Sequence, residues 1–281
     1  MSGDPTTTER AVSRSQSPPS ASPAVEGDTG EGTLATAYVL GLADDALIYA
    51  QRLGEWLTRA PQIEEDLALG NVGLDLLGQA RSLLTRAGEL EGAGRDEDDL
   101  AYLRDEREFR NVHLVEQPRA DFGHEMARML WFASYQHELY AELVTSADEV
   151  LAAVAAKAIK EVTYHRDHAG QWVVRLGDGT EESHARMQAG LEAVLPFLAE
   201  LFDDDPASVW AAEAGVGVLP SSLHDRAVAH VTAVVEQATL TLPEDSRWRS
   251  RGGRAGIHSA PMGYLLAEMQ HIHRSHPGAK W

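Results

Sequence analysis

The sequence predicts an all-α protein, and three observations support this fold class. From Leu34 onward, apolar residues recur at the 3.6-residue spacing of a helix, as in the stripe Leu151, Val154, Ala158 and Val162. The two-residue alternation typical of half-buried strands is absent. Proline and glycine residues punctuate the chain between the periodic segments. Together these features favour a bundle of long antiparallel helices joined by short or moderate loops.

The expected helices follow from the length of each apolar stripe and from the signals at its ends. They lie at about 34–59, 62–88, 121–146, 148–176, 180–202, 220–238 and 260–275. Pro61 fits the first turn of the second helix, and the run 177–179 (GDG) ends the fourth. The second helix has leucine on most sides, so we expect it to be buried. Residues 91–99 are expected to form a turn, and residues 100–120 a short helix with an exposed loop.

The chain divides into a tail and one helical domain. Residues 1–33 contain no aromatic residue and are dominated by Ser, Thr, Pro, Gly and Glu. A segment of this composition cannot bury enough apolar area to offset the entropy lost on ordering. We therefore expect residues 1–33 to be a disordered tail and residues 34–281 to form the folded domain.

Charge and cysteine content exclude several classes of function. The chain has 24 basic and 44 acidic residues, so its formal net charge is 24 − 44 = −20. Nucleic acids and anionic membranes select basic surfaces, so neither is expected as a partner. No apolar run reaches the roughly 18 residues of a membrane span, and the N-terminus lacks the apolar stretch of a signal peptide, so we expect a cytoplasmic protein. The absence of cysteine excludes disulfides, thiol catalysis and cysteine-held iron–sulfur clusters.

A helical bundle rich in carboxylates and histidines raises the question of a di-iron site. Such a site takes a Glu from each of two helices and a Glu-x-x-His motif from each of two others. The motif occurs here as Glu181 with His184 and as Glu268 with His271. The first pair lies in the opening turn after a glycine-rich loop and the second on the terminal helix, so solvated helix faces are the favoured interpretation.

A second candidate site is an arginine-rich loop near the C-terminus. Arg247, Arg249, Arg251 and Arg254 gather around a glycine-rich stretch in an otherwise acidic chain. Guanidinium groups beside flexible backbone N–H groups suit a phosphate or another polyanion. A loop that contacts an acidic partner surface is the favoured alternative.

Five segments of the chain carry a resemblance to a known family. The sequence resembles the C subunits of phenylacetyl-CoA 1,2-epoxidases, which are multicomponent bacterial monooxygenases of aerobic phenylacetate breakdown. The resemblance covers about residues 34–281 in order, with similar spacing. The matching segments are 51–56 (QRLGEW), 66–81 (DLALGNVGLDLLGQAR), 114–118 (LVEQP), 156–165 (AKAIKEVTYH) and 266–270 (LAEMQ).

The resemblance implies a ferritin-like helical bundle with additional helices. It also implies a related catalytic A subunit that holds the di-iron centre, with the C subunit as its non-catalytic mate. At the two Glu-x-x-His positions of the catalytic subunit, this chain is expected to have Asn71 and Leu74 on the second helix. On the fourth helix it is expected to have Val162 and His165 at those positions.

Four further carboxylates, on the first and third long helices, are candidates for leftover ligand positions. Carboxylates without a metal repel one another, so they are expected to be paired or to face solvent. Lys157 and Lys160 are the candidate counter-ions. The four carboxylates are Asp44, Asp45, Glu138 and Glu142.

The favoured interpretation is a structural subunit with no catalytic residue, metal or cofactor of its own. Its expected partners are the di-iron A subunit and the other subunits of the complex, with phenylacetyl-CoA near the interface. O2 and NADPH are implied as co-substrates by the resemblance, with electrons supplied by a separate reductase.

Two alternatives remain open. One is an active di-iron oxidase that uses Glu138, His165 and some of Glu161, Glu181 and His184. The other is a ferritin-type binding module with no connection to CoA substrates.

Overall fold

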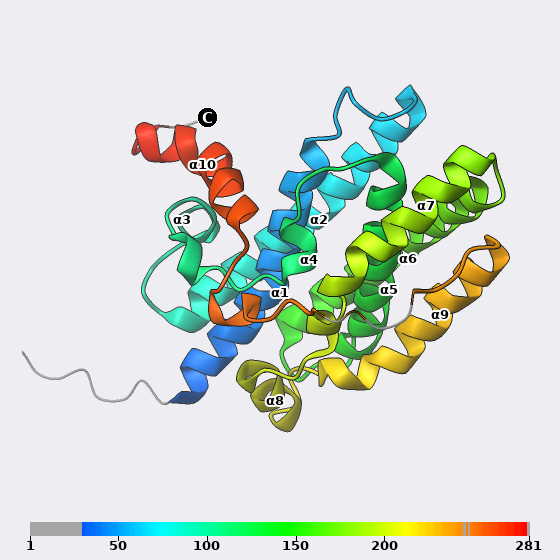
Figure 1. Cartoon of the computed structure of the whole chain (residues 1–281). Coiled ribbons are helices and arrows are strands. Elements are labelled where there is room, and N and C mark those ends of the chain that lie inside the picture. The colour runs from blue at the N-terminus through cyan, green and yellow to red at the C-terminus, as the bar shows by residue number, and fades with distance from the viewer. Residues whose placement is uncertain (1–29, 244–245, 247, 280–281) are drawn as a thin grey trace, which may run out of the picture.

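A computed structural model describes residues 30–243, 246 and 248–279, and within these residues it contains helices and no strand (Figure 1). The all-α fold class is therefore confirmed. The α-helices are α1 (Gly30–Gly54), α2 (Ile63–Glu91), α3 (Glu97–Tyr102), α4 (His113–Glu116), α5 (Phe122–Leu143), α6 (Glu149–Gly177), α7 (Glu181–Val194), α8 (Pro206–Glu213), α9 (His224–Gln237) and α10 (Ala260–Ser275). Short 3-10 helices η1 to η5 lie at Glu106–Glu108, Leu195–Phe197, Ala199–Phe202, Pro220–Leu223 and Gly253–Ala255.

Four long helices form the central bundle. Helix α1 packs along α2 and helix α5 packs along α6, and α2 also contacts α6 to join the two hairpins. Helices α7 and α9 cover α5 and α6, while α8 packs against α1 (Figure 1). Helix α10 lies across α3 and α4 on the opposite side from α9 (Figure 1). This arrangement agrees with the expected ferritin-like bundle with additional helices.

Local sequence signals explain where most helices begin. The side chain of Asp121 accepts a hydrogen bond from the backbone N–H of His124 (2.9 Å), and Asp148 caps α6 in the same way through Val150 N–H (2.9 Å). Helix α8 was not expected from the sequence. It has both signals of a helix start, because Asp205 caps it and Pro206 occupies its first position.

The core is built around α5, most of whose residues are buried. Aromatic rings fix the neighbouring helices against it: Tyr49 of α1 meets Phe132 edge to face, with ring centroids 5.2 Å apart. Near the other end of the helix, Phe122 packs edge to face against both Trp56 and Trp172. These contacts set how α1, α5 and α6 lie together at the centre of the bundle.

Two details differ from the expectation. Helix α1 begins at Gly30, earlier than the boundary at Leu34, while the rest of the expected tail, residues 1–29, lies outside the described residues. Helix α2 is not buried on all sides: Leu67 and Leu74 are each 65% exposed and Leu77 is 38% exposed. The reason is that α2 packs against α1, α3 and α6, and these contacts leave Leu67 and Leu74 largely uncovered within the described chain.

No helix in the described part of the chain is both long and apolar enough to cross a bilayer.

Candidate functional site

Polar side chains of α2 and α6 meet in the middle of the bundle. His165 of α6, which is buried, lies with Nε2 3.1 Å from Oδ2 of Asp75 on α2. On one side of this pair, Gln79 of α2 donates to Glu161 Oε2 at 3.1 Å and accepts from the Tyr140 hydroxyl at 3.1 Å. Helices α2 and α6 are therefore antiparallel, and these contacts join the two hairpins of the bundle.

The pKa of His165 lies below its ordinary value. Burial disfavours the imidazolium, and the hydrogen bond and charge of Asp75 oppose this effect without overcoming it. The ring is therefore neutral at neutral pH and satisfied by Asp75. His165 is thus a buried histidine whose hydrogen bond is made within the bundle.

One turn from the Asp75–His165 pair, both helices present valine. Val72 and Val162 precede Asp75 and His165 by three residues, and both are buried. Residues three apart share a helix face, so the inward-facing pairs are Val72 with Asp75 and Val162 with His165. Asn71 and Leu74, the expected ligand positions on α2, are exposed instead. A shift of one residue turns a side chain by about 100° around the helix, which carries Asn71 and Leu74 to the outer face.

This set of donors does not fit a di-iron centre. The centre needs two Glu-x-x-His motifs, whereas the pairs Val72–Asp75 and Val162–His165 supply one imidazole, one aspartate and two valines. The neighbouring His168 of α6 is paired with Glu65 of α2 at 3.0 Å. The described residues contain no group of three or more His, Asp or Glu side chains arranged to hold a metal ion.

The carboxylates of α1 are neutralised by arginines from distant loops. Asp44 pairs with Arg104, and both side chains are buried. Asp45 accepts a hydrogen bond from Arg254 at 2.7 Å and another from the backbone N–H of Val112 at 2.9 Å. Burial raises the pKa of Asp45 to about 6, and the charge of Arg254 opposes that rise. The expected pairing is present, but the counter-ions are arginines and not Lys157 or Lys160.

The carboxylates of α5 are paired in a similar way. Glu138 lies 2.9 Å from Arg226 Nε, and Glu142 lies 2.7 Å from Nη2 of the same guanidinium. Arg166 of α6 approaches Glu138 at 3.7 Å. Lys157 instead contacts Glu161 at 3.1 Å. All four leftover carboxylates are thus held by arginine, so none of them needs a metal ion to balance its charge.

A fully buried ion pair lies at the junction of α1 and α5. Glu125 pairs with Arg128 and also accepts hydrogen bonds from Tyr49 Oη and Trp56 Nε1, both at 2.8 Å. Burial opposes the ionisation of Glu125, but Arg128 and these donors outweigh it and hold the pKa of Glu125 below its ordinary value. The i, i+3 spacing of Glu125 and Arg128 is the only sign of this cluster in the sequence, because Tyr49 and Trp56 are about 70 residues away.

A second buried cluster was also missed because its members are far apart in sequence. His113 Nδ1 lies 2.7 Å from Glu200 Oε2, and His258 Nδ1 lies 2.8 Å from Glu116 Oε2. Burial lowers the pKa of His113, yet Glu200 and Glu116 outweigh this and raise it overall. The cluster fastens the segment before α5 to the segment before α10.

The arginine-rich loop does not form one cationic surface. Arg254 points into the protein, where Nη1 donates to the carbonyls of Gly41 (2.8 Å) and Arg110 (2.9 Å) in addition to its pairing with Asp45. Arg249 and Arg251 are exposed, and Arg247 lies outside the described residues. A polyanion therefore cannot be bound by Arg254 together with its neighbours, because Arg254 is committed to α1.

The two Glu-x-x-His pairs lie on different helices at the surface. Glu181 is exposed on α7, where His184 Nδ1 contacts the carbonyl of Gly177 at 2.7 Å. Glu268 and His271 are both exposed on α10. The structure does not bring the two pairs together.

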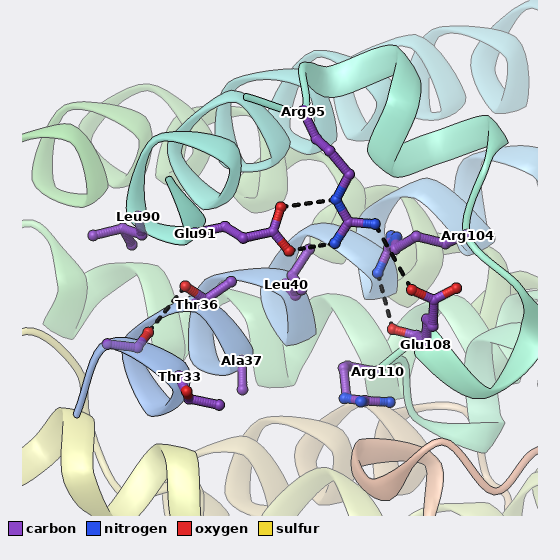
Figure 2. A pocket seen from close by; sticks show the side chains of 11 residues that line it. Thr33, Thr36, Ala37, Leu40, Leu90, Glu91, Arg95, Arg104, Glu108 and Arg110 are labelled. Atoms are coloured by element: carbon purple, nitrogen blue, oxygen red, sulfur yellow. Dashed lines mark hydrogen bonds and ion pairs between the residues drawn. The ribbon is translucent and has the colours of Figure 1, made fainter. Parts of the chain in front are cut away.

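An open pocket of about 360 Å³ lies between the start of α1 and the end of α2 (Figure 2). Figure 2 shows Arg95 between Glu91 and Glu108, with 2.7 Å from its Nε to Glu91 and 3.7 Å from Nη1 to Glu108. Arg104, which also lines the pocket, is paired with Asp44. Arg110, the third arginine of the lining, donates from Nη1 to the backbone carbonyls of Arg107 (2.7 Å) and Phe109 (3.0 Å).

Similarity to known proteins identifies the family of this chain. A family model described as phenylacetic acid catabolic protein matches residues 23–281. The chain belongs to this family. Within the phenylacetic acid catabolic family, the C subunit of the 1,2-phenylacetyl-CoA epoxidase of Escherichia coli (strain K12) is 46% identical over 246 residues, which are 88% of this chain and 98% of the relative. The resemblance stated from the sequence is confirmed.

Proposed function

We propose that this chain is a structural, non-catalytic subunit of a phenylacetyl-CoA 1,2-epoxidase, in which it pairs with and stabilises the subunit that holds the di-iron centre. The observation that carries the proposal is the inward face of α2 and α6. Val72 and Val162 take the carboxylate positions of a Glu-x-x-His pair, and Asp75 takes one of the two imidazole positions. We assign Val72 and Asp75, in place of Asn71 and Leu74, as the α2 counterparts of the ligands.

The charge pairing of the bundle supports a role that does not need metal. In a metal-bearing bundle, clustered carboxylates would repel one another whenever the site is empty. Here Arg104 and Arg254 neutralise Asp44 and Asp45. The bundle can therefore fold and present a surface to a partner without first acquiring iron.

The substrate class is carried over from the related epoxidase subunit. We infer a complex that acts on phenylacetyl-CoA with O2 and NADPH, in the cytoplasm, with the thioester bound near the contact between the two helical subunits. Electrons come from a separate reductase, because a chain without cysteine cannot hold an iron–sulfur cluster of its own.

Co-expression with the cognate A subunit tests the proposal. We expect the two chains to elute together in size-exclusion chromatography, with the iron of the complex assigned to the A subunit and substoichiometric iron on this chain when it is purified alone. Recovery of two irons per isolated chain, or elution of the two chains apart, would contradict the proposal. A large symmetric cage formed by this chain alone would favour a ferritin-type module instead.

A further inference from the structure

One face of α2 is exposed, apolar and uncharged. Leu67 and Leu74 are each 65% exposed, and Leu77 is 38% exposed. Together with Gly70, which lies between the first two, these residues form what we call the α2 seam. In a chain that carries charge on 24% of its residues, a solvent-facing surface of this kind is typical of an interaction site.

The spacing of the seam fits a helix as its occupant. Residues 67, 70, 74 and 77 are separated by three, four and three positions. This is the a/d spacing by which one helix presents a continuous edge to another helix in a coiled-coil contact. Gly70 has no side chain, and the side chain of Leu57 packs over its backbone.

The seam lies in a groove of about 440 Å³. Its lining includes Ala50 and Gly54 of α1, residues of α2, and Leu57. Tyr102 of α3 and Met269 of α10 also line it. Two antiparallel helices with an apolar floor between them form the kind of groove into which the side chains of a third helix pack.

Two of the charged groups beside the seam, Asp66 and Arg81, are engaged within the chain. Asp66 accepts hydrogen bonds from the backbone N–H groups of Thr58 (2.7 Å) and Ala60 (3.2 Å). Arg81 pairs with Glu97 at 3.1 Å. Asp66 and Arg81 are therefore not free to bind a charged ligand, and an apolar helix needs no counter-charge from the seam.

We propose that the α2 seam docks a helix of the metal-bearing partner subunit, through apolar residues at heptad spacing. This inference rests on the proposed function and names the surface that makes the contact. A second copy of this chain is a poorer occupant, because it would bring another formal charge of −20 against the first.

A single-cysteine experiment tests the contact directly. The chain has no cysteine, so Leu74→Cys introduces its one thiol, and Val209→Cys on α8, at a 37% exposed position, is the matched control. In the full complex we expect maleimide to alkylate Leu74→Cys about ten-fold more slowly than in the isolated chain, because a packed interface excludes solvent. The control should react at the same rate in both. Mass spectrometry of the separated chain distinguishes its label from any on the partner.

An affinity measurement provides the second readout. We expect the double variant Leu67→Glu/Leu74→Glu to bind the partner about 30-fold more weakly than wild type, as for loss of central interface residues, while Val209→Glu stays within about three-fold. Both leucines are largely exposed, so the isolated variants should keep the helical circular dichroism of wild type.

The possible results separate this inference from the proposed function. If wild type binds the partner and the double variant binds equally well, with Leu74→Cys unprotected, the seam is not the interface but the pairing stands. If the wild-type chain does not bind the partner subunit, both the proposed function and the assignment of the seam are overturned. If the isolated chain forms a dimer in sedimentation equilibrium that Leu67→Glu/Leu74→Glu abolishes, the occupant is a second copy and the proposed partner is overturned.

Discussion

Asp75 of α2 and His165 of α6 face each other across the bundle, with 3.1 Å between Oδ2 and Nε2. Val72 and Val162 each precede one member of this pair by three residues, and both are buried. The neutral, buried imidazole is thus satisfied by one carboxylate, and hydrocarbon occupies the space where further ligands would stand. Under the proposed function, this local arrangement is what lets the bundle do without iron, and it fixes the register in which a metal site would have to be rebuilt.

The first prediction rebuilds that site. Val72→Glu, Asp75→His and Val162→Glu together with the native His165 should raise the iron bound after anaerobic loading and desalting above the substoichiometric level expected of wild type. Each buried carboxylate should also cost on the order of 2 kcal/mol or more of unfolding free energy in the iron-free protein. Elemental analysis and thermal unfolding measure the two effects.

The matched control is the set shifted by one residue on α2: Asn71→Glu, Leu74→His and Val162→Glu. Since Asn71 and Leu74 are exposed on the outer face, this set should bind no more iron than wild type. Equal iron in the two sets would show that our assignment of the inward face is wrong.

The second prediction concerns the buried pair Asp45–Arg254. Arg254→Ala should lower the free energy of unfolding by about 3 kcal/mol near neutral pH, because it leaves Asp45 buried without a counter-ion. The pKa of Asp45 is already raised to about 6 by burial, and losing the guanidinium raises it further. Below that pKa the carboxyl takes a proton and the cost shrinks, so the destabilisation should be smaller in acid than at alkaline pH.

Chemical denaturation of Arg254→Ala at several pH values checks this prediction. Arg251→Ala is the control, because Arg251 is exposed in the same loop and its removal should change stability by less than about 0.5 kcal/mol. A pH-independent cost for Arg254→Ala would contradict the explanation.

The third prediction follows from the His113–Glu200 pair. The pKa of His113 is raised from 6.5 and that of Glu200 is lowered from 4.5, in each case because the partner outweighs burial. The stabilisation is therefore complete between those ordinary values. It is lost as the pH falls through the folded pKa of Glu200 or rises through the folded pKa of His113.

The stability difference between wild type and His113→Gln should accordingly shrink as the pH is raised from about 5.5 to about 8.5. Urea unfolding at the two pH values measures the difference. His271→Gln, at an exposed position on α10, should show no such trend. If the stability difference between wild type and His113→Gln grew as the pH was raised, the charged His113–Glu200 pair would be ruled out.

The fourth prediction tests the buried Glu125. Tyr49→Phe removes a 2.8 Å hydrogen bond to its carboxylate and should lower the free energy of unfolding by about 1.5–3 kcal/mol, the range for hydrogen bonds to charged groups. Tyr264→Phe is the control, because Tyr264 is 78% exposed, and it should be nearly neutral. If Tyr49→Phe left the free energy of unfolding unchanged, the remaining hydrogen-bond donors would be enough to stabilise the Glu125 carboxylate.

Local patterns in the sequence were enough to predict the fold class and most of the helices. Periodicity places α2, α5, α6 and α10 within a few residues of their observed bounds, because these helices are long and their caps and breakers are local signals. Short helices were not predicted. Helix α8, for example, has too few residues for a periodic apolar stripe, although Asp205 and Pro206 mark its start. The family resemblance also came from the sequence, and the 46% identity to the related epoxidase chain confirms it.

Which face of each helix meets which neighbour became visible only in the folded chain. Asn71 and Val72 are adjacent in sequence, yet one is exposed and the other is buried, because helix rotation separates neighbours by about 100°. Arg254 likewise reads as part of a cationic loop, but folding brings it to Asp45 across 209 positions of the chain. Register and long-range ion pairing depend on how helices pack against each other, and no local pattern encodes that packing.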